Sequence, residues 1–268
     1  MCGILAILDV HGEADALRPL ALNLARRLRH RGPDWSGVYV DDRAILAHER
    51  LAIVDVEHGA QPLGNPANDR FLAVNGEIYN HRELKASLTA PYAFTTDSDC
   101  EVILALYEQG VALAELPERL SGIFAFVLWD ARSGDWLIAR DPMGVCPLYM
   151  GRDERGHLLV ASELKALVDQ CRSIDDFPPG HYLTSGMDAP AAYYQPTWRD
   201  YDAVADGPSD PALLRDALEA AVRRQLMCDV PYGVLLSGGL DSSLIAAITT
   251  QLAPKRVEDD SQSAAWWH

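Results

Sequence analysis

The sequence predicts an α+β fold, in which β-sheets are covered by a few helices, followed by the start of a second, α/β unit. Short apolar runs bounded by Gly, Asp or Pro dominate residues 44–161, a pattern typical of strands. Segments with helical spacing precede and interrupt these runs, as in layered α+β domains. From residue 232 the pattern changes to an apolar run, a glycine turn and a helical segment, which is typical of an α/β unit.

The first helix is expected over residues 14–29, where apolar side chains recur at helical spacing: Leu17, Leu20, Ala21, Leu24 and Leu28. Five apolar runs are expected to be strands: Ala44–Ala47, Leu51–Val54, Phe71–Val74, Phe124–Trp129 and Leu137–Ala139. A second helix is expected over Cys100–Glu108. A strand at Leu158–Ala161 then leads into a short helix around Leu164–Val168.

Residues 185–211 are rich in Gly, Pro, Asp and Tyr, so we expect them to end the first domain and form a linker. The expected domains are residues 1–205 and 206–268. Asp210 is suited to cap a helix that has Pro211 at its first position. This helix is expected to bury a stripe of Leu214, Leu218, Ala221, Val222 and Leu226. A buried strand, Tyr232–Ser237, and a helix from Asp241 to about Leu252 follow, so the second domain is expected to be incomplete.

The composition bounds the function classes. Lysine and arginine total 23 against 39 aspartates and glutamates, a formal charge of −16. Nucleic-acid binders carry a basic surface, so this acidic chain is not expected to bind nucleic acid. Small polar metabolites are the expected partners. The apolar segment Ile4–Leu8 is too short to cross a membrane and has no basic run before it. We therefore expect a soluble, cytoplasmic protein that does not bind membranes.

Five cysteines are far apart and form no C-x-x-C pair: Cys2, Cys100, Cys146, Cys171 and Cys228. This pattern does not indicate a disulfide framework or a cysteine zinc site, and four of the five are expected to be apolar fillers. Cys2 differs because removal of Met1 would leave it with both a thiol and a free α-amine. The pKa values of these groups are about 8.5 and 8, so the amine can accept the thiol proton and produce a nucleophile.

A series of motifs follows this cysteine in order: Met1–Ile4, His30–Asp34, His48–Asp55, Asn75–Asn80, Ser98–Glu101, Phe124–Phe126, Ala139–Pro142 and Ala161–Glu163. Together they resemble the glutaminase domain of class II amidotransferases over nearly all of residues 2–200. The segment Arg31–Gly37 is more similar to the asparagine synthetase branch than to the sugar-phosphate branch. The resemblance implies the N-terminal-nucleophile fold, which has four αββα layers.

The resemblance also implies roles for individual residues. Cys2 would attack the glutamine amide, and the Asn75 side chain and Gly76 N–H would stabilise the resulting oxyanion. Arg50 would bind the α-carboxylate through two parallel hydrogen bonds, and Asp99 would bind the α-ammonium. The remaining residues expected at the substrate are Leu51, Ala52, Ile53, Val54 and Glu77. For Arg31 two roles remain open with equal weight: the positioning of a closing loop, or a structural salt bridge.

A second motif, Leu235–Ser243, lies between the expected strand and helix of the second unit. It lacks the Gly-Lys-Ser/Thr of a P-loop and the Gly-x-Ser-x-Gly of a nucleophile elbow. Serine hydroxyls and glycine N–H groups at the start of a helix can bind an anion. The motif resembles the pyrophosphate loop of enzymes that adenylate a substrate with ATP. The residues implied at ATP are Leu235, Ser237, Gly238, Gly239, Leu240, Asp241 and Ser242. Asp241 is also implied as a ligand of Mg²⁺.

The resembled family forms asparagine, glutamate, AMP and pyrophosphate from glutamine, aspartate and ATP. Because this sequence ends at His268, soon after the phosphate loop, we expect the chain alone to hydrolyse glutamine without making asparagine. A homodimer is a further expectation of the resemblance. Two alternatives remain: a relative of β-lactam synthetases, which typically lack the N-terminal cysteine, and a catalytically silent module that binds glutamine or a partner.

Overall fold

A computed structural model describes residues 1–11, 14–207 and 210–253 of the chain. It divides into two compact units, Met1–Asp206 and Gly207–His268. The expected end of the second unit, at His268, lies outside the described residues.

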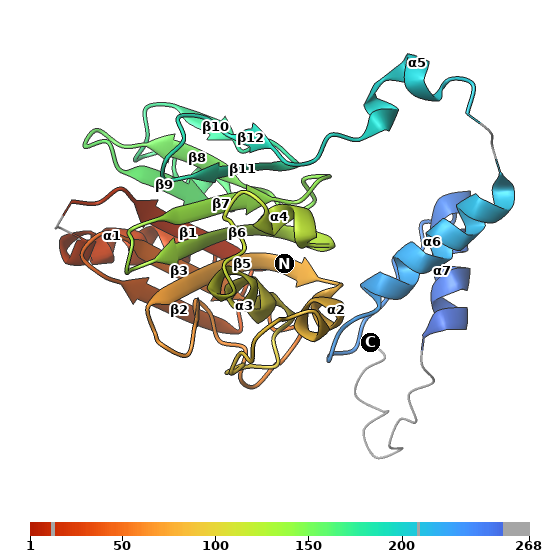
Figure 1. Cartoon of the computed structure of the whole chain (residues 1–268), viewed down its shortest axis with the longest axis horizontal. Coiled ribbons are helices and arrows are strands. Elements are labelled where there is room, and N and C mark those ends of the chain that lie inside the picture. The colour runs from red at the N-terminus through yellow and green to blue at the C-terminus, as the bar shows by residue number, and fades with distance from the viewer. Residues whose placement is uncertain (12–13, 208–209, 254–268) are drawn as a thin grey trace. The chain divides into compact units, whose positions relative to one another are not determined.

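Two six-stranded antiparallel sheets form the centre of the first unit (Figure 1). Sheet one has the order β10 (Ile174–Asp176), β8 (Tyr149–Arg152), β9 (Leu158–Ala161), β1 (Gly3–Leu8), β3 (Ile45–Arg50) and β2 (Trp35–Val40). Sheet two has the order β12 (Ala191–Ala192), β11 (His181–Thr184), β7 (Trp136–Arg140), β6 (Gly122–Asp130), β5 (Arg70–Ile78) and β4 (Leu63–Gly64).

Alternating side chains place the two sheets face to face. In β1, Ile4 and Leu8 belong to a core that also contains Phe71 and Val127 of sheet two. The intervening residue Leu5 faces the opposite way, toward helix α1 (Ala14–Arg26). Because β1 is buried on both faces, its sequence is an unbroken apolar run rather than an alternating one.

Helices cover both outer faces. Leu24 of α1 packs on the outer face of sheet one, and helix α3 (Val102–Glu108) packs on that of sheet two through Ile103. Shorter helices join the second layer: α2 (His81–Ala86) and α4 (Leu116–Arg119). The expected four-layer αββα arrangement is therefore confirmed.

One expected strand of the first unit is wrong. Leu51–Val54 is a loop, not a strand, because side chains bind its backbone: the Leu51 N–H donates to Cys2 Sγ and the Ala52 N–H to Asp34 Oδ2. The boundary between the two compact units falls within the expected linker at 185–211, but this segment also contains β12, which pairs with β11, and α5 (Tyr201–Val204).

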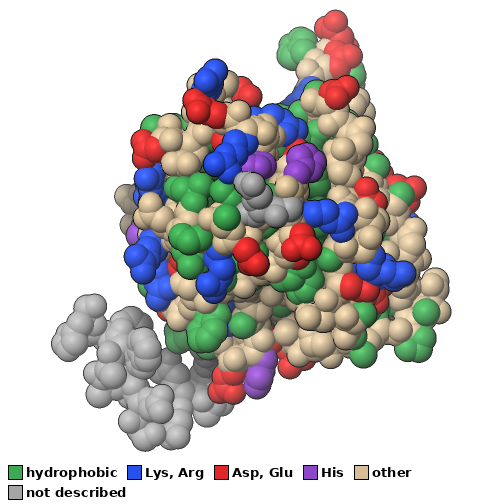
Figure 2. Space-filling model, turned by 90° about the vertical axis from the view of Figure 1, so that its left-hand side faces the viewer, with side chains coloured by type: hydrophobic (Ala, Val, Ile, Leu, Met, Phe, Trp, Pro, Cys, Tyr) green, Lys and Arg blue, Asp and Glu red, His purple; other side chains and the backbone are tan. Residues whose placement is uncertain are grey.

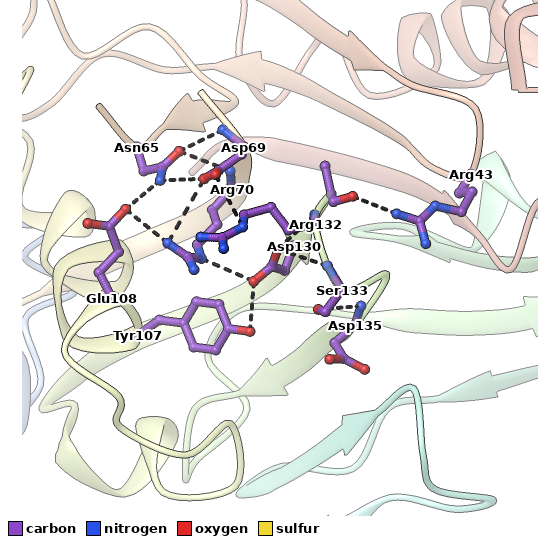
Figure 3. Close-up of polar contacts among 11 residues, drawn as sticks. Arg43, Asn65, Asp69, Arg70, Tyr107, Glu108, Asp130, Arg132, Ser133 and Asp135 are labelled. Atoms are coloured by element: carbon purple, nitrogen blue, oxygen red, sulfur yellow. Dashed lines mark hydrogen bonds and ion pairs between the residues drawn. The ribbon is translucent and has the colours of Figure 1, made fainter. Parts of the chain in front are cut away.

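A polar network fixes the start of β5 (Figure 3). Arg70 donates from Nε to Asp130 Oδ2 over 3.1 Å and from Nη1 to Glu108 Oε1 over 3.2 Å. Tyr107 OH donates to the same Asp130 oxygen over 3.0 Å. Since Asp130 ends β6 and Glu108 ends α3, the network ties the helix to both central strands.

The second unit contains helices α6 (Pro211–Gln225) and α7 (Leu240–Leu252). As expected, the Asp210 side chain caps α6 by accepting from the Ala212 N–H over 2.8 Å. The expected buried stripe is only partly formed, since Leu214 is 71% exposed and Val222 is buried. The expected strand at 232–237 is also wrong: Leu235 is 95% exposed, and no described segment pairs with it.

None of the helices in the described ranges combines the length and apolarity needed to cross a membrane. On the face drawn in Figure 2, lysine and arginine side chains are interspersed with aspartate and glutamate. This face therefore presents charges of both signs rather than one basic patch.

Candidate active site

A cavity of about 50 Å³, partly open to solvent, lies where β1 begins, β3 ends and β5 passes beyond β4. It is lined by Met1, Cys2, Arg50, Leu51, Ile53, Val54, Gly59, Gln61, Asn75, Gly76, Glu77, Ser98, Asp99, Cys100 and Ile123. The lining thus combines one accessible thiol, an arginine, two carboxylates and two side-chain amides.

Cys2 immediately precedes β1 and is held from two sides. The Leu51 N–H donates to Cys2 Sγ over 3.3 Å, and the thiol donates to Leu51 O over 3.5 Å. On the other side, Arg31 Nε donates to the Cys2 carbonyl over 2.8 Å. A side chain at Gly3 would place its Cβ 2.7 Å from Leu28 Cβ, so glycine is required for the close packing of β1 against this segment.

The electrostatics around Cys2 oppose one another. Burial raises the pKa of the thiol. The Leu51 N–H, the N-terminal amine of Met1 and the charges of Arg50 and Arg31 lower it. Arg31 is held by Glu163 over 3.0 Å. Burial would raise the pKa of Glu163, but hydrogen bonds from Arg31, Lys165 and His30 hold it at about 2. Arg31 therefore makes a salt bridge and also contacts the nucleophile's backbone.

Asn75 is fully buried on β5, and neither Oδ1 nor Nδ2 has a hydrogen-bond partner among the described residues. Leaving both groups of a buried amide unpaired is costly, and such groups are rare in folded proteins. This amide lines the cavity, so a ligand there would have both a donor and an acceptor available.

The Gly76 N–H points to the same cavity. In an antiparallel strand, N–H groups of alternate residues point to the same edge. On β5 the Val74 N–H donates to Gln61 Oε1 and the Ile78 N–H to Asp99 Oδ2, over 2.8 and 2.6 Å. Gly76 lies between them in this alternation. Its φ is 153° and a Cβ would lie 2.1 Å from Ile123 O, so only glycine fits.

Arg50 ends β3 and is only 6% exposed. It donates to the carbonyl oxygens of Val54, Asp55 and Val56, over 3.0, 2.5 and 3.1 Å. These neutral acceptors orient the guanidinium without cancelling its charge. Gly59 packs against it, since a Cβ there would lie 2.5 Å from Nη2. A guanidinium has five N–H donors, so donors remain for a carboxylate in the cavity.

Two carboxylates, Asp99 and Glu77, line the cavity. Neither forms an ion pair with another described residue. Asp99 is 3% exposed; burial raises its pKa, and the hydrogen bond from the Ile78 N–H lowers it. Burial, together with the charge of Asp99, raises the pKa of Glu77 to about 7. A ligand ammonium would compensate both charges.

The structure therefore brings together all but one of the predicted glutamine-site residues. Ala52 is the exception: it is not among the residues that line the cavity, and its N–H faces Asp34. Sequence reasoning did not single out Gln61 or Gly59, which lie in no recognised pattern. Cys100 was expected to be a filler; it is buried, but it also lines the cavity and adjoins Asp99 in the motif Ser98–Glu101.

The residues of the predicted phosphate loop lie before and within the first turn of α7. Gly239 caps the helix, Gly238 has a φ of 86°, and the Ser237 and Ser242 hydroxyls hydrogen-bond over 2.9 Å. Leu235 and Leu240 are 95% and 83% exposed, and Asp241 is exposed. Within the described ranges, no cluster of three or more His, Cys, Asp or Glu is arranged to hold a metal ion.

Comparison with known families gives two matches. The model described as "Glutamine amidotransferase domain" matches residues 1–196, and "Asparagine synthase" matches residues 213–261. Asparagine synthetase B [glutamine-hydrolyzing] of Escherichia coli K12 is 56% identical, over 100% of this chain and 48% of that protein. A probable asparagine synthetase [glutamine-hydrolyzing] of Dictyostelium discoideum is 49% identical, over 100% of this chain and 49% of that protein. The chain thus spans about half the length of these curated relatives.

Among solved structures, the glutamine phosphoribosylpyrophosphate amidotransferase from B. subtilis superposes with a TM-score of 0.58. It is 24% identical, and the match covers 71% of this chain and 48% of that one. At this identity the likeness concerns the fold alone, and it confirms the expected N-terminal-nucleophile architecture.

Proposed function

Because this chain belongs to the glutamine amidotransferase domain family, we propose that its first unit hydrolyses glutamine to glutamate and ammonia, with Cys2 as the nucleophile. One observation carries the proposal: the Asn75 side-chain amide, which has no hydrogen-bond partner among the described residues, lines the same cavity as the Cys2 thiol. A buried amide of this kind is suited to stabilise an oxyanion that exists only during reaction.

Substrate recognition would use the charges of the cavity. Arg50 would bind the α-carboxylate of glutamine, and Asp99 with Glu77 would bind its α-ammonium. Together with Leu51, Ile53 and Val54 along one wall, these groups would orient the side-chain amide toward Cys2. Other amides, which lack the two α-substituents, would bind less well.

The chemistry would proceed through a thioester. The thiolate of Cys2 attacks the amide carbon, and the resulting oxyanion accepts hydrogen bonds from Asn75 Nδ2 and the Gly76 N–H. Collapse breaks the C–N bond and releases ammonia, which takes the proton that left the thiol. Water then hydrolyses the thioester to glutamate and restores the thiol. The α-amine of Cys2 would carry the proton, so we propose that Met1 is absent from the active form.

The test is an assay of glutamate and ammonia released from glutamine, combined with the intact mass of the protein. Incubation with a glutamine-like electrophile should add one equivalent at Cys2 in chains that lack Met1. Glutamine binding without labelling or turnover would instead support the catalytically silent module. Loss of labelling when Met1 is retained would support the role of the free amine.

We further propose that the full-length protein, to which the second unit belongs, uses this ammonia to make asparagine from aspartate and ATP. The asparagine synthase match over residues 213–261 supports this. The N-terminus of α7 and the backbone at Gly238 and Gly239 are suited to pyrophosphate. Asp241 would bind Mg²⁺ together with the phosphates, and the cation would neutralise their charge.

The second proposal is tested in the full-length protein. Asp241→Asn and Ser237→Ala should lower asparagine and AMP formation from ammonia, aspartate and ATP. The same variants should hydrolyse glutamine at the parental rate, because the glutamine cavity belongs to the first unit. An equal loss of both activities would contradict the assignment of the loop to ATP.

A further inference from the structure

Val74, the residue before Asn75, has both of its backbone polar groups bound by side chains. Its carbonyl accepts from His48 Nε2 over 2.8 Å, and its N–H donates to Gln61 Oε1 over 2.8 Å. Strand β4 pairs with β5 only at Phe71 and Leu72. Beyond those residues this edge of β5 has no neighbouring strand in the described part of the chain, and the two side chains bind where a strand would.

His48 reaches Val74 from the opposite sheet. It lies on β3 two residues after Leu46, which packs in the core between the sheets, so by alternation its side chain enters the same layer. It is 1% exposed, and burial lowers its pKa to about 4. The imidazole is therefore neutral near pH 7. Since a carbonyl only accepts, Nε2 carries the hydrogen and the tautomer is fixed.

Gln61 reaches Val74 from the segment before β4 and is itself held in place. It is 8% exposed, and its backbone carbonyl lies against Gly37 of β2, where a Cβ would come within 1.9 Å. Any side chain at Gly37 would displace Gln61. Sheet one thus supports both side chains: His48 belongs to β3, and Gln61 packs against β2.

The Val74 carbonyl and the Asn75 N–H belong to one peptide group, and the next peptide group carries the Gly76 N–H. Fixing the first group from both sides limits how far the second can move. We propose that His48 and Gln61 are positioning residues. They hold the Asn75 side-chain amide and the Gly76 backbone N–H where both can donate to the oxyanion that forms when the Cys2 sulfur attacks. This inference rests on the proposed glutaminase function.

Steady-state kinetics of glutamine hydrolysis test it. In His48→Leu and Gln61→Leu, kcat should fall by about 10- to 100-fold, because a displaced oxyanion donor costs transition-state stabilisation. In His48→Leu, KM should change little, since His48 is not among the residues that line the cavity and Arg50 and Asp99 are untouched. His48→Gln keeps a side-chain N–H donor and should recover part of kcat. Alkylation of Cys2 by iodoacetamide should be unchanged in all three variants, because that reaction forms no oxyanion.

Trp136→Phe is the matched control. Trp136 Nε1 on sheet two donates to Asp9 Oδ1, after β1, over 3.0 Å, so this variant also removes a hydrogen bond that links the two sheets. It should lower stability and leave kcat unchanged. An equal loss of kcat in Trp136→Phe, or an unchanged kcat in His48→Leu, would overturn the inference.

Hydrogen exchange separates the inference from the proposed function. The backbone N–H groups of Asn75 and Gly76 should exchange faster in His48→Leu than in the parent. In Trp136→Phe they should exchange at the parental rate. A parent that hydrolyses no glutamine would refute the proposed function alone. Unchanged exchange at both amides in His48→Leu would refute the positioning role, whatever the activity of the parent.

Discussion

The Cys2 sulfur lies against both backbone polar groups of Leu51. The N–H of Leu51 donates to the sulfur over 3.3 Å, and the thiol donates to the carbonyl over 3.5 Å. Only the first bond persists in the thiolate, so the Leu51 N–H lowers the pKa of a thiol that burial raises. Leu51 follows Arg50 directly, so the segment that contacts the nucleophile also bears the cation proposed to bind the substrate.

Substitution of the nucleophile tests the centre of this arrangement. Cys2→Ala should reduce glutamine hydrolysis by at least about 10³-fold, since the other thiol at the cavity, Cys100, is buried and its pKa is raised well above the usual value by that burial. Cys2→Ser should be nearly as inactive, because a hydroxyl is far harder to deprotonate. Thermal unfolding of Cys2→Ala should resemble that of the parent, since the side chain is only partly buried. Residual turnover above background in Cys2→Ala would assign the nucleophile elsewhere.

Arg50→Lys should raise KM for glutamine by about 10- to 100-fold. A hydrogen bond to a charged group contributes about 1.5–3 kcal/mol, and 1.4 kcal/mol is a factor of ten. One ammonium cannot replace a guanidinium that already donates to the carbonyls of Val54, Asp55 and Val56 while it binds a carboxylate. Initial rates over a range of glutamine concentrations give KM and kcat separately.

Arg70→Lys is its control. Arg70 forms the network of Figure 3 with Glu108 and Asp130 at the start of β5, several residues before Asn75. Its replacement should lower the free energy of unfolding and leave KM unchanged. A parental KM in Arg50→Lys would show that the α-carboxylate binds to another group.

The sequence predicted much of the fold because apolar runs and helical spacing reflect burial directly. Runs at Phe124–Trp129 and Phe71–Val74 became the central strands β6 and β5. Leu51–Val54 is equally apolar, yet side chains from Cys2 and Asp34 bind its backbone, so it is a loop. Such contacts join residues far apart in the chain, and local pattern does not contain them.

The same limit applied to the site. Cys2, Arg50, Asn75 and Asp99 belong to recognisable motifs, and the structure gathers them at one cavity. The bond from Gln61 to the Val74 N–H depends on where β4 stops pairing, which no sequence pattern indicates. In the second unit, the expected strand at 232–237 has no pairing partner among the described residues, so apolarity alone did not make it a strand.

Glu77 predicts a pH dependence of stability. Burial and the charge of Asp99 raise its pKa from 4.5 to about 7. Because the folded state holds this proton more tightly than the unfolded state, the stabilisation is complete below about pH 4.5 and is lost as the pH rises through about 7. Denaturant unfolding should show the parent losing stability relative to Glu77→Gln, which cannot ionise, as the pH rises over this range. A difference independent of pH would contradict the raised pKa.

The same carboxyl predicts the opposite slope for binding. The glutamine ammonium favours ionised Glu77, so glutamine affinity should increase as the pH rises through about 7. Calorimetric titration of Cys2→Ala, which cannot turn the ligand over, measures this without reaction. In Glu77→Gln the increase should be smaller. An identical pH profile in the two proteins would place the ammonium away from Glu77.

Asn75→Ala should change activity and stability in opposite directions. The amide is fully buried with both polar atoms unpaired among the described residues, so the ligand-free protein bears a desolvation cost of about 1–3 kcal/mol there. Alanine removes that cost but also some packing, so the free energy of unfolding should rise by about 1 kcal/mol. Loss of the oxyanion donor should lower kcat by about 10²- to 10³-fold. Denaturant unfolding and kinetics on the same preparation measure both. A destabilised Asn75→Ala with parental kcat would show that the amide serves the fold and not the reaction.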